Sequence, residues 1–133
     1  MRESRVARLT TIGEQGVPHA VPVCFIYQHG FFYSPIDRKP KSVVPEKLAR
    51  LRNIAARPQG ALLIDHYEED WTKLWFVLIR GKATQIPSSG RRERTAAMRA
   101  LKKKYPQYAA GMLADDAPLL RIVPWRVSYW QSF

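Results

Sequence analysis

Short segments in which apolar residues alternate with polar ones, or in which β-branched and aromatic residues dominate, recur along most of the chain. Such segments predict β-strands. Strands are expected at residues 5–12, 19–28, 31–36, 60–67, 74–86 and 119–129. Only short turns separate the first three, so these strands are predicted to form an antiparallel meander.

Two segments carry a helical pattern instead. In residues 46–57, an apolar stripe at three- and four-residue spacing is provided by Leu48, Leu51, Ile54 and Ala55. A proline follows this segment and ends the helix, because the residue before proline avoids α geometry. A second helix is expected at 91–104, where alanine and basic residues favour helix formation but the apolar stripe is thin.

Strands outnumber helices, and the two do not alternate regularly as a doubly wound α/β fold would require. The length of 133 residues suits one domain covering the whole chain, 1–133. We therefore expect a mainly β domain built as a small antiparallel barrel with helices at its ends. Such a barrel has little interior volume, so a large planar ligand would lie outside it or at a subunit interface.

The net charge of +11 is concentrated in two segments. Residues 37–57 and residues 91–104 each hold seven Lys and Arg side chains. This distribution fits two anion sites, or one anion site and one exposed basic helix. Binding to nucleic acid is the remote alternative, and a specific interaction is not expected because the aromatic residues are not interleaved with the basic clusters.

No apolar run approaches the ~18 residues that a membrane-spanning helix needs, and the first residues lack the apolar core of an export signal. The single cysteine, Cys24, lies in the apolar run VPVCFIY, which predicts a buried and inert thiol. A lone cysteine cannot form an internal disulfide, which fits a reducing cytoplasm.

The common signatures of nucleotide, metal and nucleophile sites are missing. The chain has neither of the glycine-rich phosphate motifs and no nucleophile elbow. Its three histidines, His19, His29 and His66, lie far apart and without the paired spacing of metal ligands, so no metal site is expected.

Four motifs occur in a characteristic order: D-x-K-P-K from residue 37, R-L-R-N-I-x-x-x-P from residue 50, L-L-I-D-H-Y-x-x-D-W from residue 62 and W-x-x-x-x-W from residue 125. Together they resemble the pyridoxamine 5′-phosphate oxidase-like flavin and deazaflavin oxidoreductases, and more narrowly the PPOX-class enzymes that use coenzyme F420. The resemblance covers residues 5–130. It implies a six-stranded antiparallel split β-barrel with two or three flanking helices. It also implies a homodimer that binds FMN or F420 in grooves between its subunits.

The resemblance further implies where the cofactor would bind. The flavin-type ring would rest on two strand segments, with the candidates His19, Val21, Pro22, Val23, Tyr33, Ser34, Pro35 and Ile36. Its phosphate would meet Lys39, Lys41, Arg50, Arg52 and Asn53, and Trp125 or Trp130 would close the groove. Because Arg50 and Asn53 are three residues apart on a helix, they share a face from which Arg52 points away. We therefore favour the two lysines with Arg50 and Asn53.

Hydride transfer is cofactor chemistry, so no dedicated catalytic side chain is expected. The substrate-side candidates are His66, Tyr67, Trp71 and Trp75. F420 is favoured over FMN because the basic segment 91–104 and the high net charge suit its acidic tail. The resulting hypothesis is an oxidoreductase that transfers a hydride between the cofactor and a small organic substrate. The alternative is a protein that binds or carries FMN or F420 without robust turnover.

Overall fold

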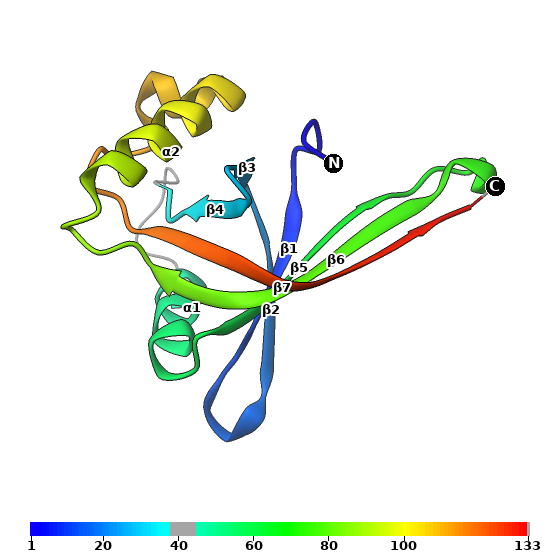
Figure 1. The fold of residues 1–133 in the computed structure, drawn as a ribbon, viewed down its shortest axis with the longest axis horizontal. Helices are drawn as coiled ribbons and strands as arrows, with labels where there is room; N and C mark the ends of the chain where they lie inside the picture. The colour runs from blue at the N-terminus through cyan, green and yellow to red at the C-terminus, as the bar shows by residue number, and fades with distance from the viewer. Residues whose placement is uncertain (38–44, 133) are drawn as a thin grey trace.

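The computed structural model describes residues 1–37 and 45–132 and contains one antiparallel sheet flanked by helices (Figure 1). The strands are β1 (Ala7–Ile12), β2 (Pro18–Val23), β3 (Ile26–Gln28), β4 (Phe31–Pro35), β5 (Gln59–His66), β6 (Trp75–Gln85) and β7 (Leu119–Gln131). The helices are α1 (Pro45–Ala56) and α2 (Arg91–Lys104), with the short helical turns η1 (Glu14–Gly16), η2 (Trp71–Lys73) and η3 (Tyr108–Met112). The expected mainly β fold is confirmed.

The order of the strands requires the sheet to curl. Its seven strands follow the order β2-β1-β5-β6-β7-β4-β3, so β2 and β3 are opposite edges. Yet only Cys24 and Phe25 separate these two strands along the chain. Laid flat, the sheet would hold its edges about 29 Å apart, whereas the step from Val23 to Ile26 spans at most about 11 Å. The two edges therefore meet at this short junction, and the sheet approaches a barrel.

The junction corrects two expectations. The predicted strand at 19–28 is divided into β2 and β3, which gives seven strands in place of six. The antiparallel pairings expected of the meander are present, β1 with β2 and β3 with β4, but the break in the middle strand places these two pairs at opposite ends of the strand order. The physical reason is that the backbone of Phe25 leaves the ladder. Its N–H donates to the Tyr105 hydroxyl at 3.1 Å, and its carbonyl accepts from Lys104 Nζ at 2.9 Å.

The core has two parts. The interior of the curled sheet is filled by apolar side chains from every strand except β3, joined by Phe25 and by Ile54 of α1. The second part lies beneath α2, where Ala97, Met98 and Leu101 are buried. The thin apolar stripe predicted for 91–104 is thus sufficient to pack that helix against the core. None of the described helices combines the length and the apolarity needed to cross a bilayer.

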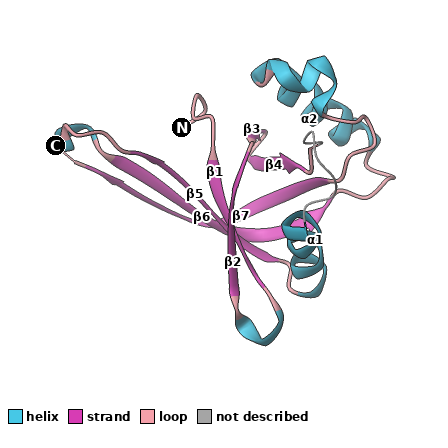
Figure 2. Cartoon of the chain, turned by 180° about the vertical axis from the view of Figure 1, so that it is seen from behind, coloured by secondary structure: helices cyan, strands magenta, loops and turns pink. Residues whose placement is uncertain are grey.

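Strands β5, β6 and β7 continue beyond the barrel as a three-stranded arm, which points away from α1 and α2 in both views (Figures 1 and 2). β6 pairs with β7 as far as Gln131, but β4 covers only residues 119–122 of β7. Among the described strands, none pairs with the outer edge of the remaining part of β7. A bulge between Arg80 and Gly81 bends the arm, and a Cβ at Gly81 would collide with the Val123 carbonyl oxygen.

Candidate functional site

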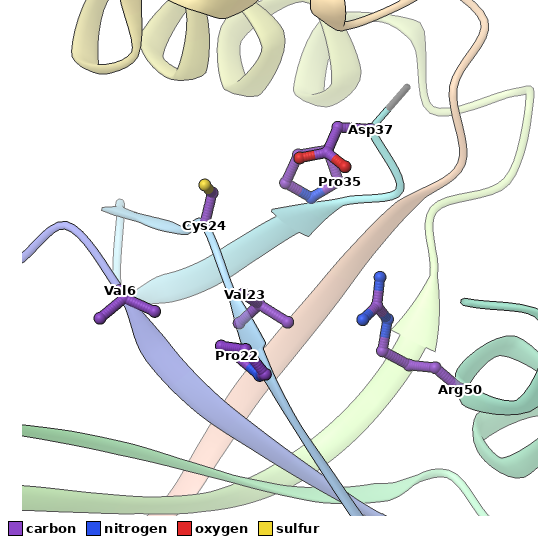
Figure 3. A pocket seen from close by; sticks show the side chains of 7 residues that line it. All are labelled: Val6, Pro22, Val23, Cys24, Pro35, Asp37 and Arg50. Atoms are coloured by element: carbon purple, nitrogen blue, oxygen red, sulfur yellow. The ribbon is translucent and has the colours of Figure 1, made fainter. Parts of the chain in front are cut away.

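A cavity of about 150 Å³ lies where the two edges of the sheet meet, between β2, β4 and α1 (Figure 3). Its lining is Val6, Pro22, Val23, Cys24, Pro35, Asp37 and Arg50. The structure therefore brings four of the predicted cofactor-site residues, Pro22, Val23, Pro35 and Arg50, to one place. The other three were not among the predicted site residues.

Strand ends build the walls of this cavity. Pro22 and Val23 lie at the end of β2, and Pro35 ends β4. The fully buried Ser34 Oγ donates a 2.8 Å hydrogen bond to the Cys24 carbonyl oxygen, which ties β4 to the β2–β3 junction. Cys24 itself is half-buried, so the expectation of a buried thiol is wrong: the residue follows the end of the β1–β2 ladder at Val23 and lines the cavity.

Arg50 is the buried cation of the cavity. It is 6% exposed, and Figure 3 shows its guanidinium reaching from α1 toward the space below Pro35 and Asp37. Burial lowers the pKa of Arg50, while the Asp37 carboxylate and Tyr108 act in the opposite direction. Its Nε atom has no hydrogen-bond partner within the part of the chain that the structure describes. A buried donor without a partner destabilises a protein by about 1–3 kcal/mol, so an anionic acceptor would be favoured here.

Asp37 supplies the negative charge of the same cavity. The Tyr108 hydroxyl donates to Asp37 Oδ2 at 2.6 Å, which holds the carboxylate at the cavity wall. Burial, followed by the Asp37 hydrogen bond, raises the pKa of Tyr108 far above its ordinary value, so Tyr108 remains a donor across the physiological range. Among the described residues that line it, the site thus contains one arginine and one carboxylate.

The other two predicted residues of α1 face elsewhere. Arg52 and Asn53 line a separate cavity of about 310 Å³ beside the β1–β2 turn. Asn53 Nδ2 donates to Thr11 Oγ1 at 3.1 Å, which fixes this amide on β1. Residues three apart on a helix differ in direction by roughly 60°, and that difference is enough to send Arg50 and Asn53 into different cavities. Lys39 and Lys41 lie outside the described residues.

The remaining predicted platform residues support the sheet. His19 is half-buried in β2, with Nδ1 unpartnered among the residues described. Val21 packs against the core, and the Ile36 N–H donates to the Pro118 carbonyl at 2.9 Å. Tyr33 is 3% exposed, and its hydroxyl donates to Glu93 at 2.6 Å rather than facing a cavity.

Glu93 is the centre of a network that sequence reasoning did not find. It accepts from Tyr33 and from Arg121 Nη1, the latter at 2.7 and 2.9 Å, and so joins β4 and β7 to the first turn of α2. Burial raises the pKa of Glu93, but the hydrogen bonds from Tyr33 and Arg121 outweigh it and the net shift is downward. Burial and the Glu93 contact raise the pKa of Tyr33.

The predicted substrate-side residues lie between the end of β5 and the start of β6, in the arm that points away from α1 (Figure 1). The His66 ring stacks on Trp75 with ring centres 6.2 Å apart and pairs with Glu68. Trp71 Nε1 donates to the Tyr67 hydroxyl at 3.4 Å. One chain therefore does not bring these residues to the cavity at the barrel seam.

The two C-terminal tryptophans also belong to the arm. Trp130 stacks on Phe76 with ring centres 5.9 Å apart, and Trp125 is 59% exposed on β7. Neither residue lines the seam cavity. Among the described residues, no group of three or more His, Cys, Asp or Glu side chains could hold a metal ion.

An antiparallel sheet whose edges meet at a two-residue junction, with a cavity at that seam, defines a split β-barrel protein. The family model described as pyridoxamine 5′-phosphate oxidase matches residues 1–131, and the chain belongs to this family. The resemblance drawn from the sequence motifs is thereby confirmed, as is the split-barrel fold. No curated protein matches the chain.

Solved structures show the same fold at low identity. A FAD-binding protein from Mesorhizobium loti has a TM-score of 0.67 and 19% identity, over 96% of this chain and 84% of that one. The heme storage protein of Vibrio cholerae has a TM-score of 0.73 and 16% identity, over 97% and 87% of the two chains. A heme-binding protein from Mycobacterium smegmatis has a TM-score of 0.75 and 19% identity, over 98% of this chain and 50% of that one.

Proposed function

We propose that this protein is a cytoplasmic oxidoreductase that uses a flavin or deazaflavin cofactor to transfer a hydride to or from a small organic substrate. The observation that carries the proposal is the seam cavity, where Pro22, Val23 and Pro35 meet the buried Arg50. These residue types suit a ligand with an apolar ring and an anionic group. Family membership and the similarity to a FAD-binding structure support the same ligand class.

Arg50 and the two prolines of the cavity have distinct roles in this proposal. Arg50 binds the phosphate of the cofactor, because a guanidinium can donate two parallel hydrogen bonds to a phosphate. Its Nε atom also forms no hydrogen bond with any described residue. Lys39 and Lys41 follow β4 in the sequence and are proposed to add to this anion site. The prolines, which lack an N–H, give an apolar wall for the ring. The bound cofactor supplies the hydride chemistry, while the protein positions it and excludes water.

The cavity of one chain is too small for the whole cofactor. Its volume of about 150 Å³ is below the roughly 300–1,000 Å³ of ordinary ligand pockets. We infer that a second copy of the chain completes the site in a homodimer. The open edge of β7, where Trp125, Val127 and Tyr129 are 57–62% exposed, provides an apolar surface for that contact. Trp125 or Trp130 would then close the groove, and His66, Tyr67, Trp71 and Trp75 would face the substrate.

The choice between F420 and FMN rests on α2. Lys102 pairs with Asp115, and Arg94 donates to the Asp115 and Ala117 carbonyls. The exposed cations of this helix are Arg91, Arg92, Arg99 and Lys103. We propose that they attract the acidic tail of F420, a contact that FMN cannot make.

A binding or carrier role without turnover is the second candidate. Two of the similar structures, a heme storage protein and a heme-binding protein, favour it. The described lining of the seam cavity contains no histidine, the common axial ligand of heme, so a flavin-type ligand suits this chain better.

Titration separates these possibilities. F420, FMN, FAD and heme are each added to the purified protein while cofactor fluorescence or absorbance is followed. Saturable binding of F420 or FMN is expected, followed by steady reduction of an enone or quinone by the reduced cofactor. Binding without any turnover over a broad substrate set would favour the carrier. Binding of heme alone would contradict the proposal.

A further inference from the structure

Lys104, the last residue of α2, is a half-buried amine outside the proposed cofactor site. Its Nζ lies 3.8 Å from the centre of the Phe25 ring and 5.2 Å from that of Tyr105. It donates one hydrogen bond, of 2.9 Å, to the Phe25 carbonyl oxygen. Residues of the β2–β3 junction and the end of α2 therefore fix the position of the amine.

The surroundings of Lys104 differ from those of its two neighbours. Lys102 pairs with Asp115 at 2.8 Å, and Lys103 is exposed. Lys104 forms no ion pair with any carboxylate in the described ranges 1–37 and 45–132. Instead the Arg5 guanidinium stands close by: it donates to the Lys104 carbonyl oxygen at 2.7 Å and lies 4.7 Å from the Tyr105 ring centre.

These contacts make Lys104 a stronger nucleophile near neutral pH than an ordinary lysine. Burial, and then the charge of Arg5, lower the pKa of Lys104 to about 8, against weaker opposing effects of Cys24 and Glu3. At pH 8 about half of the side chain is therefore the free amine. Lysine amines placed in apolar surroundings gain reactivity in this way.

The amine also borders a cavity. A space of about 400 Å³ is lined by Arg2, Ile26, Tyr27, Gln28, His29, Ala100 and Lys104. The Arg2 guanidinium lies 5.2 Å from the Tyr27 ring centre, on the wall of this space. The lining has no carboxylate among the described residues, so it suits a small anionic molecule.

We propose that Lys104 is a site of covalent acylation, and that the cavity beside it takes a small acyl phosphate as the acyl donor. The neutral amine attacks the carbonyl carbon, the new C–N bond forms and the C–O bond to phosphate breaks. Inorganic phosphate leaves, held by the Arg2 guanidinium, and the amine proton passes to water. The product is a neutral amide at the end of α2, next to the β2–β3 junction. This proposal is independent of the proposed oxidoreductase activity.

The test uses acetyl phosphate and the folded, full-length protein between pH 6.5 and 9.5. Acetylation of Lys102, Lys103 and Lys104 is followed with time by mass spectrometry that resolves the three positions. At pH 8 Lys104 is expected to react about tenfold faster than Lys103, because about half of the Lys104 side chain is then the free amine. Its rate should level off as pH rises past about 8. If acetylation rates instead rank with the solvent exposure of the three lysines, so that Lys103 reacts fastest at every pH, the proposal is overturned.

Arg2→Gln tests the cavity separately. The variant is expected to slow acetylation of Lys104 by acetyl phosphate several-fold and to leave its reaction with uncharged acetic anhydride unchanged. The anhydride serves as the control for folding and for the reactivity of the amine. Equal rates with acetyl phosphate in the variant and the parent protein would exclude the assigned phosphate contact.

Discussion

Ser34 and Cys24 close the barrel: the buried hydroxyl of Ser34 donates to the carbonyl oxygen of Cys24 at 2.8 Å, across the seam between β4 and β2. Ser34→Ala leaves that acceptor without its donor, which should lower the free energy of unfolding by about 1–2 kcal/mol. Chemical denaturation measures the change. Ser88→Ala, in an exposed loop, is the control and should change stability little. Equal stability of the two variants would show that the seam bond contributes nothing.

Gly81 determines how the arm leaves the barrel. A methyl group there would meet the backbone of Val123, which cannot move without opening the β6–β7 ladder. Gly81→Ala should therefore lower the free energy of unfolding by more than about 2 kcal/mol. Gly60→Ala is the comparison, because its Cβ would lie 3.3 Å from a side-chain methyl, that of Ala83, and needs only a small adjustment. A larger loss for Gly60→Ala than for Gly81→Ala would contradict this interpretation of the bulge.

The Glu93 network predicts a pH dependence of stability. Because the net shift of the Glu93 pKa in the folded state is downward from 4.5, the carboxylate stabilises the fold above that unfolded-state value. The contribution is lost as pH falls through the lower, folded-state pKa. Glu93→Gln should be less stable than the parent at pH 7, and the difference should shrink in acid.

Thermal unfolding of both proteins between pH 2.5 and 7 measures this effect. Glu14→Gln, at an exposed turn, is the control and should follow the parent at every pH. A difference between Glu93→Gln and the parent that stays constant down to pH 2.5 would show that the ionised network does not stabilise the fold.

The exposed edge of β7 predicts self-association. Val127→Asp places a charge in the middle of that apolar surface and should convert a dimer into a monomer, because a buried, unpaired carboxylate is strongly unfavourable. Val17→Asp is a matched control, since Val17 and Val127 are 59% and 57% exposed and Val17 lies beside the β1–β2 turn. Sedimentation or light scattering gives the mass. A wild-type protein that is monomeric at high concentration would contradict the dimer.

Local sequence patterns predicted most of the fold but not the closure of its seam. Strand periodicity placed six strands, and helix stripes placed α1 and α2 within one or two residues of their bounds. The break at Phe25 was not visible because its partners, Lys104 and Tyr105, are about 80 residues away. Contacts this distant leave no trace in a periodic pattern.

The same limit applies to the site. The family resemblance implied Arg50, Pro22 and Pro35 as cofactor-site candidates, and the fold brings these three residues together. Helical spacing alone grouped Arg50 with Asn53. In the structure β1 lies next to α1, and Asn53 donates to Thr11 of β1 instead. Asp37 and Cys24 reach the cavity only because the two sheet edges meet, which no local signal reveals.

Titration of the wild-type protein, Arg50→Gln and Arg57→Gln with F420 and with FMN tests the central claim most directly. Arg57 is exposed at the end of α1 and donates to the Gly13 carbonyl oxygen, so its variant matches the lost charge without touching the seam cavity. Wild type and Arg57→Gln should bind equally. Arg50→Gln loses a charge-assisted hydrogen bond of roughly 1.5–3 kcal/mol, so this variant should bind the cofactor about 10–100-fold more weakly. No binding of either cofactor to the wild-type protein, or equal affinity in Arg50→Gln, would contradict the proposed site.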